Sequence, residues 1–287
     1  MNWSPLLRWY ANEKRDLPWR KTHDPYRILV SEVMLQQTQV SRVLDFYKRW
    51  LKTFPTWHAL ARASNADVIH AWAGLGYNRR GLMLRDIAKE VVKGGVPKTE
   101  QEWLELKGIG PYTAAAISAF AQGQKTIPID TNIRRVLGRV LLGKPFPDLK
   151  DDERLKKKVG PQKPELWQAT FDLAVAICKK DPDCASCPMR SQCPASKKFL
   201  SGRVRIPKQM IKKAVETKHR DKPFPDRIYR GRILKEVRLN HGDLKTLGSR
   251  IDPAFVSSQD QEWLERMLSR MQKDGMIRLL KNRATLA

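Results

Sequence analysis

The sequence has few acidic residues, few cysteines and no long apolar run. Only 30 Asp and Glu stand against 55 Lys and Arg in 287 residues, which gives a formal net charge of +25. Apolar runs such as TAAAISAFA are far shorter than the roughly 20 residues that a membrane-spanning helix needs. The N-terminus, MNWSPLLRWYANEKRD, lacks the apolar core and cleavage site of a signal peptide. These absences argue against a membrane protein and predict a soluble, cytoplasmic one, nucleoid-associated if the source is a prokaryote.

The excess of basic residues predicts a polyanionic partner. Clustered Lys and Arg release condensed counterions when they neutralise phosphates, so nucleic acid is the first class to consider. Ribosomal and membrane-surface proteins are basic too, so charge alone names neither a sequence nor a reaction. With 41% hydrophobic residues and nine Trp, the chain is predicted to be globular and to form two or three domains.

Strand patterns are scarce, and apolar residues recur mostly at the three- and four-residue spacing of helices. This periodicity predicts an all-α fold, with Gly and Pro separating the helices at AGLGY, KGGVPKT and KGIGPY. Thr38 is expected to cap a second helix within the first helical range. The predicted helical ranges are 26–50, 66–73, 79–93, 101–106, 112–121, 131–142 and 164–178.

The C-terminal third differs in composition from the rest. Residues 197–222 contain ten Lys or Arg against two acids, with little periodicity, which predicts a basic linker. Helices are then expected at 228–237, 243–251 and 259–273, followed by a two-stranded hairpin that turns at KN. Three helices and a hairpin indicate a small winged-helix-like domain, although a purely helical adaptor fits almost as well.

All four cysteines lie together. Cys178, Cys184, Cys187 and Cys193 have the spacing C-x5-C-x2-C-x5-C within 16 residues. Four thiolates this close can surround one metal centre, and disulfides are not expected in a cytoplasmic protein. Four unrelated buried cysteines would rarely cluster so tightly. The spacing favours a metal site and leaves zinc and an iron-sulfur cluster equally open.

The segment LKGIGPYTAAAISAF, residues 106–120, is a Gly-x-Gly turn that leads into a helix. Gly108 and Gly110, on either side of Ile109, permit a tight turn whose backbone N–H groups can face a phosphate. This is the helix-hairpin-helix pattern, which non-catalytic DNA-binding proteins also use. An ordinary glycine turn between two helices is the plainer interpretation.

Two acidic residues are candidates for chemistry. Asp130, in PIDTNIRR, opens a predicted helix, where an aspartate is most often an N-cap but can also stabilise a developing cation. Glu32, in EVMLQQTQV, has Ile28, Leu29 and Leu35 as helical neighbours, and burial among them would raise the carboxyl pKa. Glycosidic cleavage uses such a pair, one carboxyl protonated and one ionised. Because a lone Glu on a helix is usually solvated, the pairing is a hypothesis.

Together these motifs resemble the helix-hairpin-helix DNA glycosylases, and most closely the MutY-type adenine DNA glycosylases. The resemblance covers about residues 8–195 and rests on LPWR, DPYRILVSEVMLQQTQV, GLGY, LKGIGPYTAAAI, IDTNIRRV and the four cysteines. SEVMLQQTQV is the most specific motif, since endonuclease III and thymine-mismatch relatives share the hairpin and cysteine motifs. The resemblance implies two helical subdomains, a six-helix barrel (25–128) and a [4Fe-4S] cluster subdomain (1–24 and 129–196). Composition and periodicity add a basic linker (197–226) and the winged-helix-like domain (227–287).

The resemblance also implies roles for single residues. Glu32 would protonate adenine and later help water attack, and Asp130 would stabilise the oxocarbenium-like sugar. A lysine that forms a Schiff base in bifunctional relatives is replaced here by Tyr112, whose phenol cannot do so. The other expected site residues are Asn132 beside the catalytic groups, Trp19 and Arg20 in the base pocket, Gln37 and Tyr77 as probe or wedge near the opposing base, and Gly108, Ile109 and Gly110 at a phosphate.

The resemblance therefore implies a monofunctional, monomeric glycosylase that excises adenine paired with 8-oxoguanine or guanine in double-stranded DNA, starting base excision repair. A thymine or uracil mismatch glycosylase is the alternative enzyme, and a non-catalytic DNA-binding protein is the alternative outside enzymes. Two features depart from the family. The first cysteine gap is five residues where six is usual, and about 90 residues follow Cys193 without the pattern of the family's Nudix-like domain. The winged-helix-like domain is expected to act there as a basic DNA clamp, which leaves a strict preference for 8-oxoguanine open.

Overall fold

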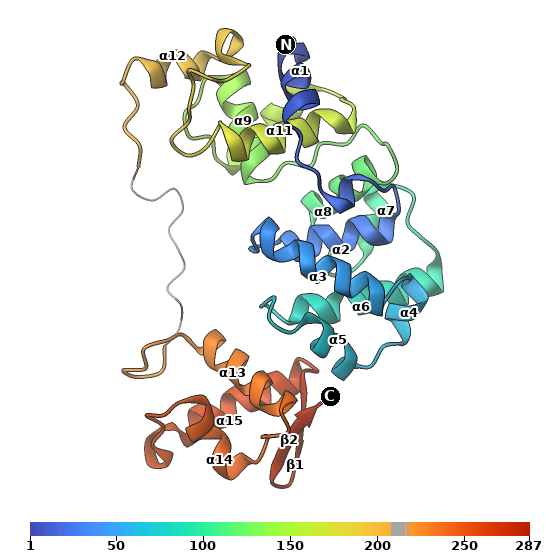
Figure 1. Ribbon diagram of the computed structural model, residues 1–287, viewed down its shortest axis with the longest axis vertical. Helices are drawn as coiled ribbons and strands as arrows, with labels where there is room; N and C mark the ends of the chain where they lie inside the picture. Colours follow the sequence, from blue (N-terminus) through green and yellow to red (C-terminus); the bar gives the residue numbers. More distant parts are fainter. Residues whose placement is uncertain (208–215, 217) are drawn as a thin grey trace. The chain divides into compact units, whose positions relative to one another are not determined.

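A computed structural model describes residues 1–207, 216 and 218–287, and it is predominantly helical (Figure 1). Contacts between Cα atoms divide the chain into two compact units, Met1–Val33 with Val96–Lys212, and Met34–Gly95 with Lys213–Ala287. The predicted all-α fold is confirmed, because the only sheet among the described residues is a two-stranded hairpin. Residues 208–215 and 217 of the predicted linker lie outside the described residues, and the predicted domain bounds stay a prediction.

The first unit is built around two helices, α9 (Thr131–Leu142) and α11 (Pro164–Ala176), which pack on each other. On α9 the residues Ile133, Val136, Leu137 and Val140 follow helical spacing and are all buried in this core. The other elements of this unit are α1 (Ser4–Glu13), η1 (Pro18–Arg20), α7 (Glu100–Glu105), α8 (Pro111–Phe120), η2 (Leu149–Asp151), α10 (Asp152–Val159), η3 (Arg190–Gln192) and α12 (Pro194–Leu200). Helix α2 (Pro25–Leu35) begins in this unit and ends in the other.

The second unit combines two stretches of sequence. In the first stretch, α4 (Trp57–Arg62) and α5 (Asn65–Trp72) pack on α6 (Arg79–Gly94), and α3 (Val40–Thr53) contacts α5. The second stretch contains α13 (Asp226–Arg238), α14 (Leu244–Ile251), α15 (Ser257–Lys273), β1 (Ile277–Leu280) and β2 (Arg283–Leu286). The two strands pair antiparallel, with Leu280 opposite Arg283, so the hairpin turns at Lys281 and Asn282 as predicted.

Two details of the helical prediction need correction. Gln39, rather than Thr38, is the N-cap of α3, and its side chain makes no capping hydrogen bond. The Thr38 hydroxyl instead donates to the carbonyl of Gln36. Helices α1, α4, α10 and α12 were also not predicted. The six-residue α4 is too short to be stable alone and is held by packing on α6, which local sequence does not reveal. No helix in the described ranges is long and apolar enough to cross a membrane.

Candidate active site and cysteine cluster

Glu32 lies on α2, where only 8% of the residue is exposed. The Tyr112 hydroxyl on α8 donates a 2.8 Å hydrogen bond to its Oε2. Burial raises the pKa of Glu32 to about 7. The negative charge of Asp130 also raises it, whereas the hydrogen bond from Tyr112 lowers it. Glu32 therefore meets the condition of burial under which the sequence predicted a raised pKa, and near neutral pH a large fraction of this carboxyl is protonated.

Asp130 is the N-cap of α9. Its Oδ1 accepts hydrogen bonds from the backbone N–H groups of Asn132 (2.8 Å) and Ile133 (2.7 Å), and its Oδ2 accepts one from the Asn132 side-chain amide (2.7 Å). Burial raises the pKa of Asp130, and these three hydrogen bonds oppose that rise. The capping interpretation is thus correct, and it also fixes the direction of the carboxylate.

Tyr112 links the hairpin to the two carboxyls. Gly108 has a left-handed φ of +100°, and the side chain of Ile109 is buried between α7 and α8. Pro111 then starts α8, which places Tyr112 in its first turn. Burial raises the pKa of Tyr112 well above its usual value, and the charges of Glu32 and Asp130 raise it further. The phenol is therefore a neutral hydrogen-bond donor, and the first unit brings Glu32, Tyr112 and Asp130 together from three helices.

Trp19 and Arg20 form most of the short helix η1, and Trp19 is buried. The Arg20 guanidinium donates two hydrogen bonds, of 2.7 and 2.8 Å, to the buried carboxylate of Asp172 on α11. Arg15 donates to the same carboxylate at 2.6 Å. Burial raises the pKa of Asp172, but the hydrogen bonds and charges of these two arginines outweigh burial and bring the pKa below its usual value. Asp172 was not predicted, although it is the single charged residue of the largely apolar segment ATFDLAVA.

Gln37 and Tyr77 belong to the second unit and share an uncommon backbone conformation. Their φ values are +56° and +49°, in the left-handed region that side-chain-bearing residues rarely adopt. Arg80, which is 9% exposed, holds both turns by donating to the carbonyls of Gln36 (2.5 Å) and Gly76 (3.1 Å). Its guanidinium also lies 5.5 Å from the centre of the Tyr77 ring. Sequence reasoning missed Arg80, because its partners are backbone atoms 4 and 44 residues away.

The four cysteines line one small cavity in the first unit, together with Arg139 and Phe199. One Arg139 N–H group lies 3.4 Å from the sulfur of Cys178. Burial, and to a smaller degree the neighbouring thiolates, raise the pKa of Cys184 to about 11 and of Cys187 to about 12. Such thiols deprotonate together only when a cation is bound among them. Among the described residues, no three His, Cys, Asp or Glu side chains are placed to hold a single metal ion.

Comparison with known proteins shows the family to which this chain belongs. The family described as HhH-GPD superfamily base excision DNA repair protein matches residues 30–162. The chain is 40% identical over 218 residues to the adenine DNA glycosylase of Rattus norvegicus, which covers 69% of this chain and 42% of that protein. It is 33% identical over 281 residues to the adenine DNA glycosylase of Mycolicibacterium smegmatis, which covers 95% of this chain and 91% of that protein. The chain belongs to the adenine DNA glycosylase family.

Within the adenine DNA glycosylase family, this chain is short beside some relatives. It spans about two fifths of the length of the rat and human proteins that it matches. A solved structure of a thermostable thymine-DNA glycosylase superposes with a TM-score of 0.62 at 29% identity, over 68% of this chain and 94% of that one. The adenine DNA glycosylase relatives confirm the resemblance predicted from the motifs, and the family and structural matches confirm the helix-hairpin-helix glycosylase fold class.

Proposed function

We propose that this chain is a monofunctional adenine DNA glycosylase that removes adenine paired with 8-oxoguanine or guanine in double-stranded DNA. The reaction hydrolyses the N-glycosidic bond and starts base excision repair. The observation that carries the proposal is the buried Glu32, held by the Tyr112 hydroxyl at 2.8 Å and titrating at about 7. A carboxyl that keeps its proton near neutral pH can act as a general acid toward a base.

In the proposed reaction, protonated Glu32 gives its proton to a ring nitrogen of the extruded adenine. The glycosidic bond then breaks, the electron pair leaves with adenine, and positive charge develops on the sugar. Asp130, oriented by Asn132 and by the α9 N-terminus, stabilises this charge. The Glu32 carboxylate finally accepts a proton from the water that attacks the sugar, with Trp19 and Arg20 beside the base.

Tyr112 makes the proposed enzyme monofunctional. Its phenol has no amine to condense with the sugar aldehyde, and its raised pKa keeps it protonated. The enzyme is expected to leave an abasic site without nicking the strand. Borohydride treatment during the reaction should therefore trap no enzyme–DNA adduct, and efficient trapping would refute this assignment.

The proposal also gives roles to the two turns and the hairpin. Gly108 and Gly110 present backbone N–H groups to a phosphate at the start of α8, while the N–H of Ile109 between them donates to the carbonyl of Leu106 and holds the turn. Gln37 and Tyr77 contact the stack around the opposing base, and Tyr77 is exposed enough for this, at 51%. The left-handed backbone at both residues supports a functional assignment, because such strain persists where surrounding structure enforces it. We further propose that the protein acts as a cytoplasmic monomer.

We propose a [4Fe-4S] cluster held by Cys178, Cys184, Cys187 and Cys193. The support is their common cavity, their short spacing and the family, and bound iron would keep the four thiols deprotonated. The cluster has no step in the proposed chemistry and would stabilise the loops around it. Iron analysis with a visible absorption spectrum of anaerobically purified protein tests this, and stoichiometric zinc without iron would favour the alternative.

Single-turnover assays test the base that is released. Duplexes with A:8-oxoguanine, A:G, T:G and U:G pairs would be compared for the wild-type protein, Glu32→Gln, Asp130→Asn and the exposed control Glu13→Gln. We expect that only the wild-type protein and the control variant release adenine. The likeness to a thymine-DNA glycosylase structure favours thymine as the second candidate. Release of thymine or uracil but never adenine would replace the proposal by that candidate.

A further inference from the structure

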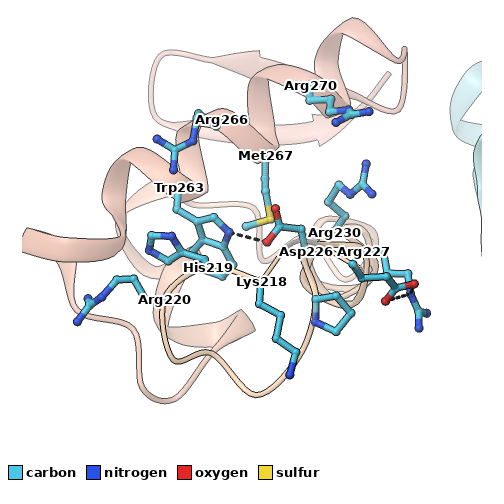
Figure 2. A pocket seen from close by; sticks show the side chains of 12 residues that line it. Lys218, His219, Arg220, Asp226, Arg227, Arg230, Trp263, Arg266, Met267 and Arg270 are labelled. Atoms are coloured by element: carbon cyan, nitrogen blue, oxygen red, sulfur yellow. Dashed lines mark hydrogen bonds and ion pairs between the residues drawn. The ribbon is translucent and has the colours of Figure 1, made fainter. Parts of the chain in front are cut away.

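A cavity of about 620 Å³ lies in the C-terminal part of the second unit, between the segment before α13, α13 itself and α15 (Figure 2). Its wall carries six basic side chains and only two acidic ones, Glu216 and Asp226. The basic residues are Lys218, Arg220, Arg227, Arg230, Arg266 and Arg270. The proposed chemistry does not use this pocket, which we name the α13–α15 pocket, and the expected clamp role of the domain assigns it no residue.

Aromatic and apolar side chains form the floor of the α13–α15 pocket. Trp263 is buried, and the His219 ring stacks on it with centroids 4.9 Å apart and planes 8° from parallel. The indole Nε1 of Trp263 donates to Asp226 at 3.0 Å, as drawn in Figure 2. His219 Nε2 lies 3.0 Å from Asp260 Oδ1. Each ring is therefore fixed from two sides, and the floor is preorganised.

A buried ion-pair network holds the basic rim in place. The Lys222 ammonium is 2.8 Å from Asp260 and 2.6 Å from Asp252, and all three residues are at most 6% exposed. Lys222 also donates to the carbonyl of Ala254 at 2.9 Å. This network ties the segment that carries Lys218 and Arg220 to α15, so the rim has a fixed geometry before any ligand binds.

Part of the positive charge in the pocket has no acidic partner. Glu216 pairs with Arg227 at 2.7 Å, and Arg220 lies 3.5 Å from Asp260. Over the described ranges, neither Arg230 nor Arg270 has an ion pair or a side-chain hydrogen bond. Arg266 has one weak pair on the exposed face of its helix, at 3.5 Å from Glu262. Cations held close together repel one another, so an anion that binds here relieves this repulsion.

We propose that the α13–α15 pocket binds a backbone phosphate of duplex DNA, with Arg230 and Arg270 as its main contacts. This inference rests on the proposed function, which makes DNA the polyanion available. The planar guanidinium groups suit phosphate oxygens, and the Trp263 indole, which is buried under the His219 ring, offers no free face on which a base could stack. The pocket therefore adds affinity without reading sequence.

The test compares two double variants of the full-length protein in duplex binding at several salt concentrations. Arg230→Ala/Arg270→Ala removes two charges from the pocket. Arg250→Ala/Arg278→Ala removes two exposed charges of the same domain outside it. The pocket variant should lower the slope of log affinity against log salt by about 1 to 2 and weaken binding roughly tenfold, while the control changes little. The rate of adenine release at saturating enzyme should stay the same in the control variant.

Further measurements separate the possible outcomes. Arg230→Lys/Arg270→Lys should restore the salt slope, and thermal melting should show that all variants fold. Equal losses in the pocket and control variants would overturn the proposal, because charge alone would then explain binding. Thermal stabilisation of the wild type by dAMP, with duplex affinity unchanged in the pocket variant, would also overturn it, in favour of a free nucleotide. If the wild type released no adenine but the pocket variant still lowered the salt slope, the proposed function would fail and the pocket would stand.

Discussion

Two buried carboxyls, Glu32 in the first unit and Asp260 in the second, have opposite ionisation behaviour. They are 8% and 0% exposed, so both are removed from water. In the described structure Glu32 has the neutral phenol of Tyr112 as its hydrogen-bond partner, and its pKa rises to about 7. Asp260 is also desolvated, but Lys222, the backbone N–H of Val256 and His219 bring its pKa below the ordinary value. Burial alone therefore does not set the charge of a carboxyl, because the charge of its partner decides.

The comparison separates a chemical role from a structural one. A carboxyl whose protonated and ionised forms are close in free energy can transfer a proton, which is what Glu32 is proposed to do. A carboxyl locked in its ionised form by a buried lysine can only hold structure together, as Asp260 does in the C-terminal domain.

The largest expected effect is on chemistry. Glu32→Gln removes the transferable proton but keeps the size of the side chain, so single-turnover adenine release should fall by about 10² to 10⁴-fold. Quenched-flow or manual sampling on an A:8-oxoguanine duplex measures this, with Glu13→Gln as the exposed control. Full activity of the Glu32 variant would end the proposed acid role.

The next largest effect is expected on the stability of the C-terminal part of the second unit, which contains Asp260. Asp260→Asn leaves Lys222 with Asp252 as its one remaining carboxylate, and breaking such a buried pair should lower the free energy of unfolding by about 3 kcal/mol. The lowered pKa means that the ionised form stabilises the native state above the ordinary Asp pKa. The difference from wild type should therefore shrink as pH falls through the native pKa. Denaturant titrations at pH 7 and pH 3 test this against the exposed control Asp221→Asn.

Glu32→Gln should have the opposite effect on stability. The native pKa of about 7 lies above the ordinary 4.5, so the wild-type protein loses stability as pH rises between these values. The amide that replaces the carboxyl stays neutral, and at about 1.4 kcal/mol per pKa unit the variant should be more stable at pH 8 by up to roughly 3 kcal/mol. At pH 4 the two proteins should unfold alike. A stabilisation of equal size at both pH values would mean that packing, rather than charge, is responsible.

The smallest effect is expected for Arg80, a buried cation that can be compared with the two buried carboxyls. Arg80 is held by carbonyls and aromatic rings, and its pKa is lowered by burial. Arg80→Met should release the turns of Gln37 and Tyr77, and the ratio of adenine release from A:G over A:T duplexes should fall about tenfold. Lys89→Met removes an exposed charge from the same helix as a control. An unchanged ratio with a lower melting temperature would show that Arg80 has only a structural role.

Much of the fold was predictable because its signals are local. Helical spacing predicted α9 with its observed bounds, residues 131–142, and the KN sequence predicted a hairpin with its observed turn. The Thr38 prediction was wrong because α3 begins directly after Gln39, one residue later, and α4 was missed because it depends on packing against α6. The candidate carboxyls were found from their motifs, but the sequence contained no sign of their partners.

The sequence by itself determined the all-α class, the family and the residue types available for chemistry, because motif spacing and apolar periodicity are properties of neighbouring residues. Only the tertiary structure decided that Tyr112 donates a hydrogen bond to Glu32, 80 residues away in the sequence. It also decided that Arg20 donates to Asp172, 152 residues away. The same holds for the network of Lys222 with Asp252 and Asp260. A pKa or a buried ion pair depends on desolvation and on distances between segments remote in the chain, and these exist only once the core has formed.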